Sequence, residues 1–343
     1  MLLYVNFPSW LKPEIVPFLP IRWYGLMYIV AFGIAWMLCR YQVRERNFPV
    51  KEEELSSLFF WGILALILGA RLMAALVYSG DIYYREPWRI FWPFENGRFT
   101  GLMGMSYHGG VIGALAAVII YSIKHKFDMR ETGDIVAAGI PLGYTAGRLG
   151  NFINGELYGR VTAGPLGMIF PQAERLSLDK SWVADIAAKL GIFDASGFVN
   201  LPRHPSQLYE AFFEGIVLWC IIWALRNKKP FKGFLMGIYI AGYGLFRFVI
   251  EYFREPDADL GYRITLVKTE LPPAIFSSLW NFSTGQLFCF AMILGGLLWL
   301  LIAARLPNAT PVRIYPAGPD SEEKAKTAKK EARKNRRKTR RIR

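Results

Sequence analysis

The chain has 343 residues, of which 53% are hydrophobic, and a formal net charge of +14 at pH 7. Apolar runs of about 20 residues recur along it, and that is the length needed to cross the hydrocarbon core of a bilayer. The composition argues against a water-soluble domain and predicts an all-α membrane protein.

Seven transmembrane helices are predicted. The start of the sequence, Met1–Pro20, lacks the positively charged region and cleavage site of a secretory signal, so we expect the first span to serve as its own insertion signal. The second contains Arg71, and the fourth is short and rich in glycine. In chain order the predicted spans are Leu19–Cys39, Leu55–Tyr78, Ser106–Ile123, Gly133–Gly150, Ser206–Leu225, Gly233–Phe253 and Gly285–Ala304.

Basic residues predict the orientation. The short loops after the first, third and fifth spans carry three or four Lys and Arg each, and they fall on the same side as the C-terminus. Because short cytoplasmic loops collect Lys and Arg, we expect a cytoplasmic C-terminus and an N-terminus outside.

The segment of about 151–205 then lies outside, as a small periplasmic head between the fourth and fifth spans. Within it, Asp179–Asn200 predicts a short amphipathic helix that ends at Gly191. Residues 1–305 form the predicted transmembrane catalytic domain, head included. Residues 306–343 form a basic, disordered cytoplasmic tail.

The tail is nearly all Lys, Arg and small polar residues from Lys324 to Arg343. Such a segment is attracted to anionic headgroups, at about 1 kcal/mol per basic residue near the surface. Membrane lipids are therefore its expected partner, RNA contact is a weaker option, and no nucleic-acid-binding domain is predicted. Cys39, Cys220 and Cys289 lie in apolar segments without metal-ligand spacing, so we expect neither a metal site nor a cofactor.

Polar residues are concentrated in Gly147–Arg160, directly after an apolar segment. If the helix continues, Arg148, Asn151, Gly155 and Gly159 share one arc of about 80°, with Glu156 about 80° further round. This pattern is typical of an anion site. The alternative is a helix end at which Arg148 pairs structurally with Glu156.

Other unusual residues are assigned to the same outer depth. Tyr24 opens the first span, His108 opens the third, and Arg247 and Glu251 are four apart on the sixth. Each has a structural alternative: an interfacial aromatic residue, a hydrogen-bonded histidine, and an interhelical ion pair. Together with Arg148 they favour a shared cavity at headgroup level.

Two arginines in such a cavity suggest a lipid phosphate as ligand, and a histidine suggests proton transfer near pH 7. The chain contains neither Gly-x-Ser-x-Gly nor His-Glu-x-x-His. The nucleophile is therefore expected to come from a substrate.

Five motifs, in this order, resemble the bacterial prolipoprotein diacylglyceryl transferase family. The similarity runs from about Ile21 to Ala304. The motifs are Trp23–Tyr28 (WYGLMY), Tyr107–Gly110 (YHGG), Gly147–Gly159 (GRLGNFINGELYG), Arg203–Glu210 (RHPSQLYE), and Phe246–Arg247 with Glu251–Asp257 (FR and EYFREPD).

The resemblance implies an enzyme of the bacterial inner membrane that acts first in lipoprotein maturation. It would transfer the diacylglyceryl group from phosphatidylglycerol to the lipobox cysteine thiol of a prolipoprotein, form a thioether and release glycerol phosphate. The positions implied by motif match are Tyr24, His108, Arg148, Asn151, Glu156, Gly159, Arg247 and Glu251.

Specific roles follow from the chemistry. We expect His108 to act as general base, with Glu251 as second candidate, and Arg148 and Arg247 to bind the phosphate. Asn151 and Tyr24 would donate hydrogen bonds, while Glu156 and Glu251 hold the arginines. Gly155 and Gly159 would leave room for the lipid or for a neighbouring helix. An anionic lipid transporter that uses the same arginines is the main alternative, and a structural protein is a third.

Overall fold

The computed structural model describes residues 4–16, 22–45, 50–78, 82–92, 94–95, 97–99, 104–256, 261–269 and 271–307. The chain divides into two compact units. The first comprises Met1–Arg46 and Met129–Ala309, and the second comprises Asn47–Asp128 and Thr310–Arg343. Apart from Leu306 and Pro307, the predicted basic tail lies outside the described residues, as does the predicted start of the first span at Leu19.

Five helices of the described chain are long and apolar enough to cross a membrane. Their positions agree with five of the seven predicted spans, which confirms a predominantly helical membrane protein. They are Trp23–Glu45 (α1), Glu52–Val77, Tyr107–His125 (α4), Ser206–Leu225 and Thr284–Arg305 (α11). The second of them combines α2 (Glu52–Met73) with the start of a π-helix, Ala74–Tyr78.

The fourth predicted span, Gly133–Gly150, is wrong as a single helix. The structure has α5 (Met129–Ala137) and α6 (Ile140–Asn154) in its place. Pro141, in the first turn of α6, has no N–H to donate to a preceding helical turn. The chain therefore breaks its hydrogen-bond ladder here and starts a new helix.

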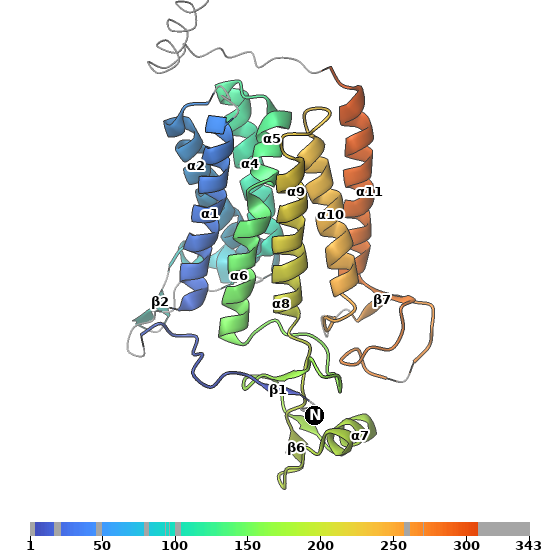
Figure 1. Ribbon diagram of the computed structural model, residues 1–343. Coiled ribbons are helices and arrows are strands. Elements are labelled where there is room, and N and C mark those ends of the chain that lie inside the picture. Colours follow the sequence, from blue (N-terminus) through green and yellow to red (C-terminus); the bar gives the residue numbers. More distant parts are fainter. Residues whose placement is uncertain are drawn as a thin grey trace, which may run out of the picture. The chain divides into compact units, whose positions relative to one another are not determined.

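The sixth predicted span is shortened to α10 (Phe234–Ile250), an apolar helix of 17 residues. The chain turns at Glu251–Phe253 and leaves the helix before the predicted end. Within the first unit, α1 packs against α6, and α10 packs against α11 (Figure 1).

The Ser206–Leu225 helix consists of α8 (Ser206–Glu210), a π-helical stretch η3 (Ala211–Val217) and α9 (Leu218–Leu225). The stretch η3 packs against α6, and a buried apolar cluster between α9 and α10 contains Leu218, Ile222 and Leu235. These contacts fix α6, η3 and α10 beside one another.

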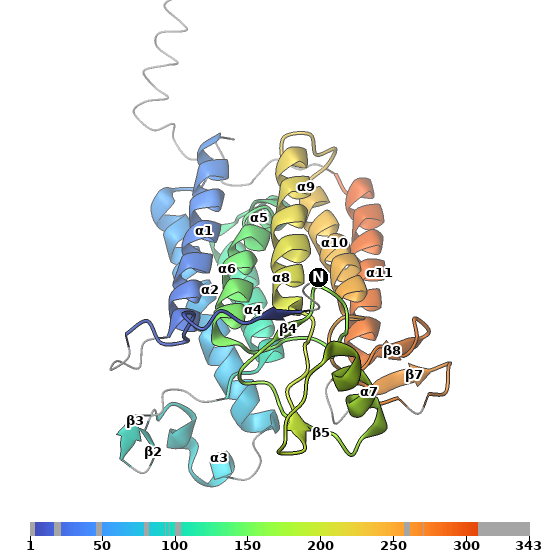
Figure 2. The ribbon, with the colours of Figure 1, turned by 60° about the horizontal axis from the view of Figure 1, so that its bottom comes forward.

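The segment between α6 and α8 forms a small lobe around α7 (Ser181–Leu190) (Figure 2). The predicted amphipathic helix is confirmed, including its end at Gly191, where φ is +66°. Val183 and Leu190 are buried with residues of β5 (Leu176–Ser177) and β6 (Phe198–Val199). Short strands also join distant segments: β1 (Val5–Asn6) pairs with β4 (Met168–Ile169), and β7 (Tyr262–Thr265) pairs with β8 (Asn281–Ser283).

In the second unit, Arg71 is a buried structural residue. Its guanidinium donates to the backbone oxygens of Ile90, Arg89 and Gly104 and to the Tyr83 hydroxyl. It thereby holds the loop that contains α3 (Ile82–Arg85), η2 (Pro87–Ile90) and the hairpin of β2 (Phe94–Glu95) and β3 (Arg98–Phe99).

The helices α2 and α4 contact each other through glycines. A Cβ added to Gly113 would lie 2.1 Å from the Ala65 oxygen, and one added to Gly109 would lie 2.3 Å from the Gly69 oxygen. Small residues of this kind let transmembrane backbones approach closely. The α2–α4 pair therefore depends on the absence of side chains at these positions.

We predict that Gly113→Ala lowers the thermal unfolding temperature of the purified protein, because overpacking costs about 1 to 3 kcal/mol. The matched control is Gly62→Ala on α2, where an added Cβ has nothing within 4 Å. Alanine is the better helix former, so the control should unfold at the same or a higher temperature. Equal melting temperatures for both variants would contradict the packing explanation.

Candidate active site

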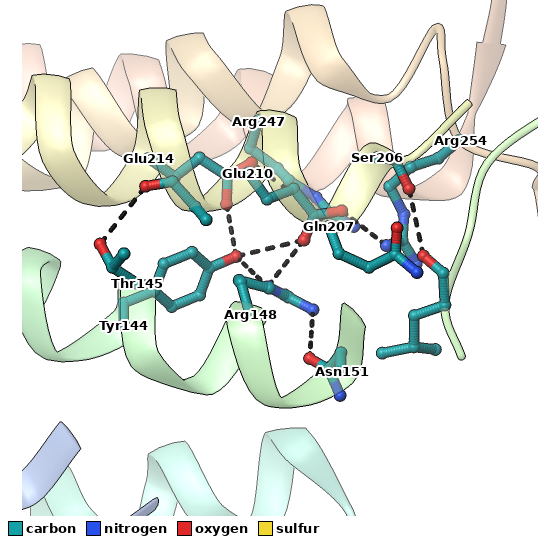
Figure 3. Close-up of polar contacts among 12 residues, drawn as sticks. Tyr144, Thr145, Arg148, Asn151, Ser206, Gln207, Glu210, Glu214, Arg247 and Arg254 are labelled. Carbon is teal, nitrogen blue, oxygen red and sulfur yellow. Dashed lines mark hydrogen bonds and ion pairs between the residues drawn. The ribbon is translucent and has the colours of Figure 1, made fainter. Parts of the chain in front are cut away.

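One carboxylate in the first unit forms ion pairs with three arginines. Glu210, at the end of α8, is completely buried. Its Oε2 lies 2.7 Å from Arg148 Nε, and its Oε1 lies 3.1 Å from Arg247 Nη1 and 2.7 Å from Arg254 Nη1 (Figure 3). These arginines come from α6, from α10 and from the turn that follows α10. The result is a cluster of three arginines that share Glu210 as a common counter-ion.

A second carboxylate lies one turn further along the same helix. Glu214 is buried in η3, and its Oε2 accepts a hydrogen bond of 2.5 Å from the Tyr144 hydroxyl. That hydroxyl in turn accepts one of 2.6 Å from Arg148 Nε. The α6 helix can come this close because Gly215 has no side chain: a Cβ there would lie 2.0 Å from Thr145 Oγ1.

The predicted ion pair between Arg247 and Glu251 is confirmed, with 3.2 Å between Nη2 and Oε2. The same Oε2 lies 3.7 Å from Arg254 Nε. Glu251 Oε1 accepts a hydrogen bond of 3.1 Å from Ser283 Oγ, at the N-cap of α11. The first turn of α11 therefore fixes the rotamer of this carboxylate.

Glu156 does not hold Arg148 directly. Arg148 donates a 3.4 Å hydrogen bond to Asn151 Oδ1, and Asn151 Nδ2 donates one of 3.0 Å to Glu156 Oε1. Asn154 Nδ2 donates to the same oxygen over 3.3 Å. The ion-pair partner of Arg148 is instead Glu210, because α6 ends at Asn154 and the chain carries Glu156 off the helix.

The expectation that the helix continues through Gly159 is wrong. Gly155 has φ +67° and caps α6, so Gly155 and Gly159 do not continue the face of Arg148 and Asn151. Gly159 donates its N–H to the His204 oxygen, and a Cβ added to it would lie 2.1 Å from the Phe253 oxygen. Its lack of a side chain is therefore required by close backbone packing.

His204 closes this junction as a neutral residue. Its Nδ1 lies 3.3 Å from the Tyr209 hydroxyl, and its ring packs edge-to-face against Phe253. Burial lowers the pKa of His204, and the positive charge of Arg160 lowers it further. The position therefore supports structure and does not supply a positive charge at pH 7.

Tyr24 and His108 lie at helix starts. Tyr24 is in the first turn of α1, with its hydroxyl 2.8 Å from that of Tyr28. The α1 helix packs on α6 at Gly150, where a Cβ would lie 3.1 Å from Met27 Cβ. His108 is exposed in the first turn of α4, which belongs to the second unit.

The structure thus brings together five of the eight predicted site residues: Arg148, Asn151, Glu156, Arg247 and Glu251. It adds four that the sequence analysis did not assign to the site: Tyr144, Glu210, Glu214 and Arg254. Two carboxylates four residues apart within an apolar span are a signal that could have identified Glu210 and Glu214, because intramembrane acids are rare and paired.

Comparisons with known proteins identify the family. A family model described as prolipoprotein diacylglyceryl transferase matches residues 13–302. The proteins named phosphatidylglycerol–prolipoprotein diacylglyceryl transferase in Treponema denticola and Treponema pallidum are 53% and 50% identical to this chain, covering 88% and 86% of it and 95% and 94% of their own lengths. A protein of the same name in Chlorobaculum tepidum is 42% identical, covering 85% of this chain and 90% of its own.

We predict that Glu210→Gln destabilises the protein by roughly 3 to 5 kcal/mol, since removing one partner of a buried ion pair leaves charge uncompensated. Thermal unfolding in neutral detergent measures the loss. The control is Glu14→Gln, which removes an exposed partner 3.9 Å from Arg22. Such surface pairs contribute at most about 1 kcal/mol. A Glu210→Gln variant as stable as the control would show that the arginines do not need this carboxylate.

Proposed function

The chain belongs to the prolipoprotein diacylglyceryl transferase family, and we propose that it transfers the diacylglyceryl group of phosphatidylglycerol to the lipobox cysteine thiol of a prolipoprotein. As a member of this family it is a transferase. The observation that carries the substrate assignment is the convergence of Arg148, Arg247 and Arg254 on one buried carboxylate. Guanidinium groups in this arrangement suit the charge-assisted recognition of a phosphodiester.

In the proposed reaction the thiol sulfur bonds to the carbon of the diacylglyceryl group that carries the phosphate. The carbon–oxygen bond breaks, its electron pair stays with the phosphate, and glycerol phosphate leaves. The phosphate gains a second negative charge as this bond breaks. Arg148 and Arg247 accelerate the step if they bind the developing dianion more tightly than the diester.

The thiol must also lose its proton, because only a few per cent of a free thiol is ionised at pH 7. His108 is the proposed general base and Glu251 the second candidate. Asn151 and Tyr24 are proposed as hydrogen-bond donors to the lipid headgroup. Glu156 orients the Asn151 amide through their 3.0 Å hydrogen bond. Glu156 therefore acts on Arg148 only indirectly, through Asn151.

We further propose seven membrane crossings with the N-terminus outside and the C-terminus cytoplasmic, in the bacterial inner membrane. The five long helices supply five crossings, α10 supplies one, and α5 with α6 supplies the remaining one. The 17 residues of α10 rise about 25 Å, which covers most of a hydrocarbon core about 30 Å thick. The lobe at about 151–205 is then the periplasmic head, within a catalytic domain of residues 1–305.

The experiment that tests this function uses a synthetic lipobox peptide, phosphatidylglycerol and the purified protein in detergent. Mass spectrometry of the peptide should show the addition of one diacylglyceryl group on the cysteine. A peptide with serine in place of that cysteine is the control and should stay unmodified. An unmodified cysteine peptide would favour the anionic lipid transporter, which finds no support in the relatives compared.

We predict that Arg148→Ala and Arg247→Ala abolish transfer in this assay, because each removes charge that stabilises the leaving phosphate. His108→Gln should retain a small residue of activity, since a general base contributes about 10² to 10⁴ in rate. The matched control is Arg175→Ala, which removes an arginine paired with Asp194 in the head. Wild-type transfer by either cluster variant would refute the assignment.

A further inference from the structure

Among the three carboxylates of the arginine cluster, Glu214 has the longest contact with an arginine, and the reaction described above gives it no role. Its Oε1 lies 3.9 Å from Arg247 Nη1, which is too far for a direct hydrogen bond. In the part of the chain that the structure describes, Glu214 Oε1 is buried without a hydrogen-bond partner, whereas Arg247 Nη1 lies 3.1 Å from Glu210 Oε1. Leaving a buried polar atom unsatisfied costs free energy, so a proton on Glu214 Oε1 that is donated to a ligand oxygen would satisfy it.

The charges of the cluster balance without any ligand. Arg148, Arg247 and Arg254 supply three positive charges, and Glu210, Glu214 and Glu251 supply three negative charges. A phosphodiester brings one further negative charge. Burying it in a neutral cluster is unfavourable unless another charge changes.

We propose, resting on the function proposed above, that Glu214 takes up one proton when the phosphodiester of phosphatidylglycerol binds. The proton comes from the buffered solvent and forms an O–H bond at Glu214 Oε1. The cluster with its lipid is then neutral again. The new O–H can donate to a phosphate oxygen, and the guanidinium of Arg247, released from Glu214, can face the same phosphate.

The other two carboxylates are poorer sites for this proton. Glu210 is held by three arginines, and Glu251 by two arginines and the Ser283 hydroxyl. Arginines stay charged and tyrosines neutral near pH 7, so they do not take it up. The titratable groups that face Glu214 are Glu210 on α8, Tyr144 and Arg148 on α6, Arg247 and Tyr243 on α10, and Cys289 on α11.

Calorimetry tests the proposal directly. Short-chain phosphatidylglycerol is titrated into the full-length protein in neutral detergent, in two buffers of equal pH but different ionisation enthalpy. The difference in heat gives the number of protons exchanged per lipid bound. Binding is measured instead of turnover so that the ionisation of the peptide thiol does not contribute.

We expect the wild-type protein to take up about one proton per lipid and to lose about tenfold in affinity for each pH unit above the ionisation of Glu214. The isosteric Glu214→Gln variant should bind with no proton uptake and with an affinity independent of pH. Glu255→Gln, which removes a carboxylate paired with Arg203 outside the cluster, should behave as wild type.

If the wild-type protein binds the lipid without taking up a proton, the inference is wrong and the proposed function is unaffected. In that case an arginine would leave its carboxylate and bind the phosphate instead. Proton uptake that persists in Glu214→Gln would overturn it as well. Should that variant fail to fold, the wild-type proton count still decides. Failure of the wild-type protein to bind phosphatidylglycerol at all would overturn the proposed function, and this inference with it.

Discussion

The buried carboxylate of Glu210 is the constraint on which the site depends. Three guanidinium groups could not share an apolar interior without a counter-ion, because each would repel the others and lose its hydration. Glu210 meets this requirement for residues from α6, from α10 and from the turn after α10. Together with Glu214 and Glu251 it balances the three positive charges, so the site can respond to an incoming anion.

Close backbone contacts place the helices at the distance that this carboxylate needs. Gly215 lets η3 approach α6 beside Thr145, and Gly159 lets the segment after α6 approach the turn after α10. Arg160 stabilises this junction: its Nε donates to the Arg254 oxygen over 2.7 Å and its Nη1 to the Pro273 and Ile275 oxygens. The turn that carries Arg254 is therefore fixed from outside the bundle as well as by Glu210.

The hydroxyl of Ser283 links a further helix to the same site. It caps α11 by accepting from the Gln286 N–H and also donates to Glu251. Fixing Glu251 also fixes Arg247, since the two side chains are paired across one turn of α10. Charged groups of the site are thus oriented by contacts at helix termini.

The local sequence pattern was sufficient to predict several features. Apolar run length located five long helices, period and a terminal glycine located α7, and spacing of four residues located the Arg247–Glu251 pair. The motif around Arg148 and Asn151 identified the family and a polar site. These features depend on residues close together in the chain, so the amino-acid sequence determines them by itself.

Only the tertiary structure decided which carboxylate partners which arginine. Glu156 is near Arg148 in the chain, yet the end of α6 at Gly155 turns it away. The ion-pair partner of Arg148 is Glu210, which lies 62 residues after it in the sequence. The role of Gly159 likewise depends on a backbone oxygen of Phe253. Ion pairing and close packing are set by distances in space, and sequence separation does not encode those distances.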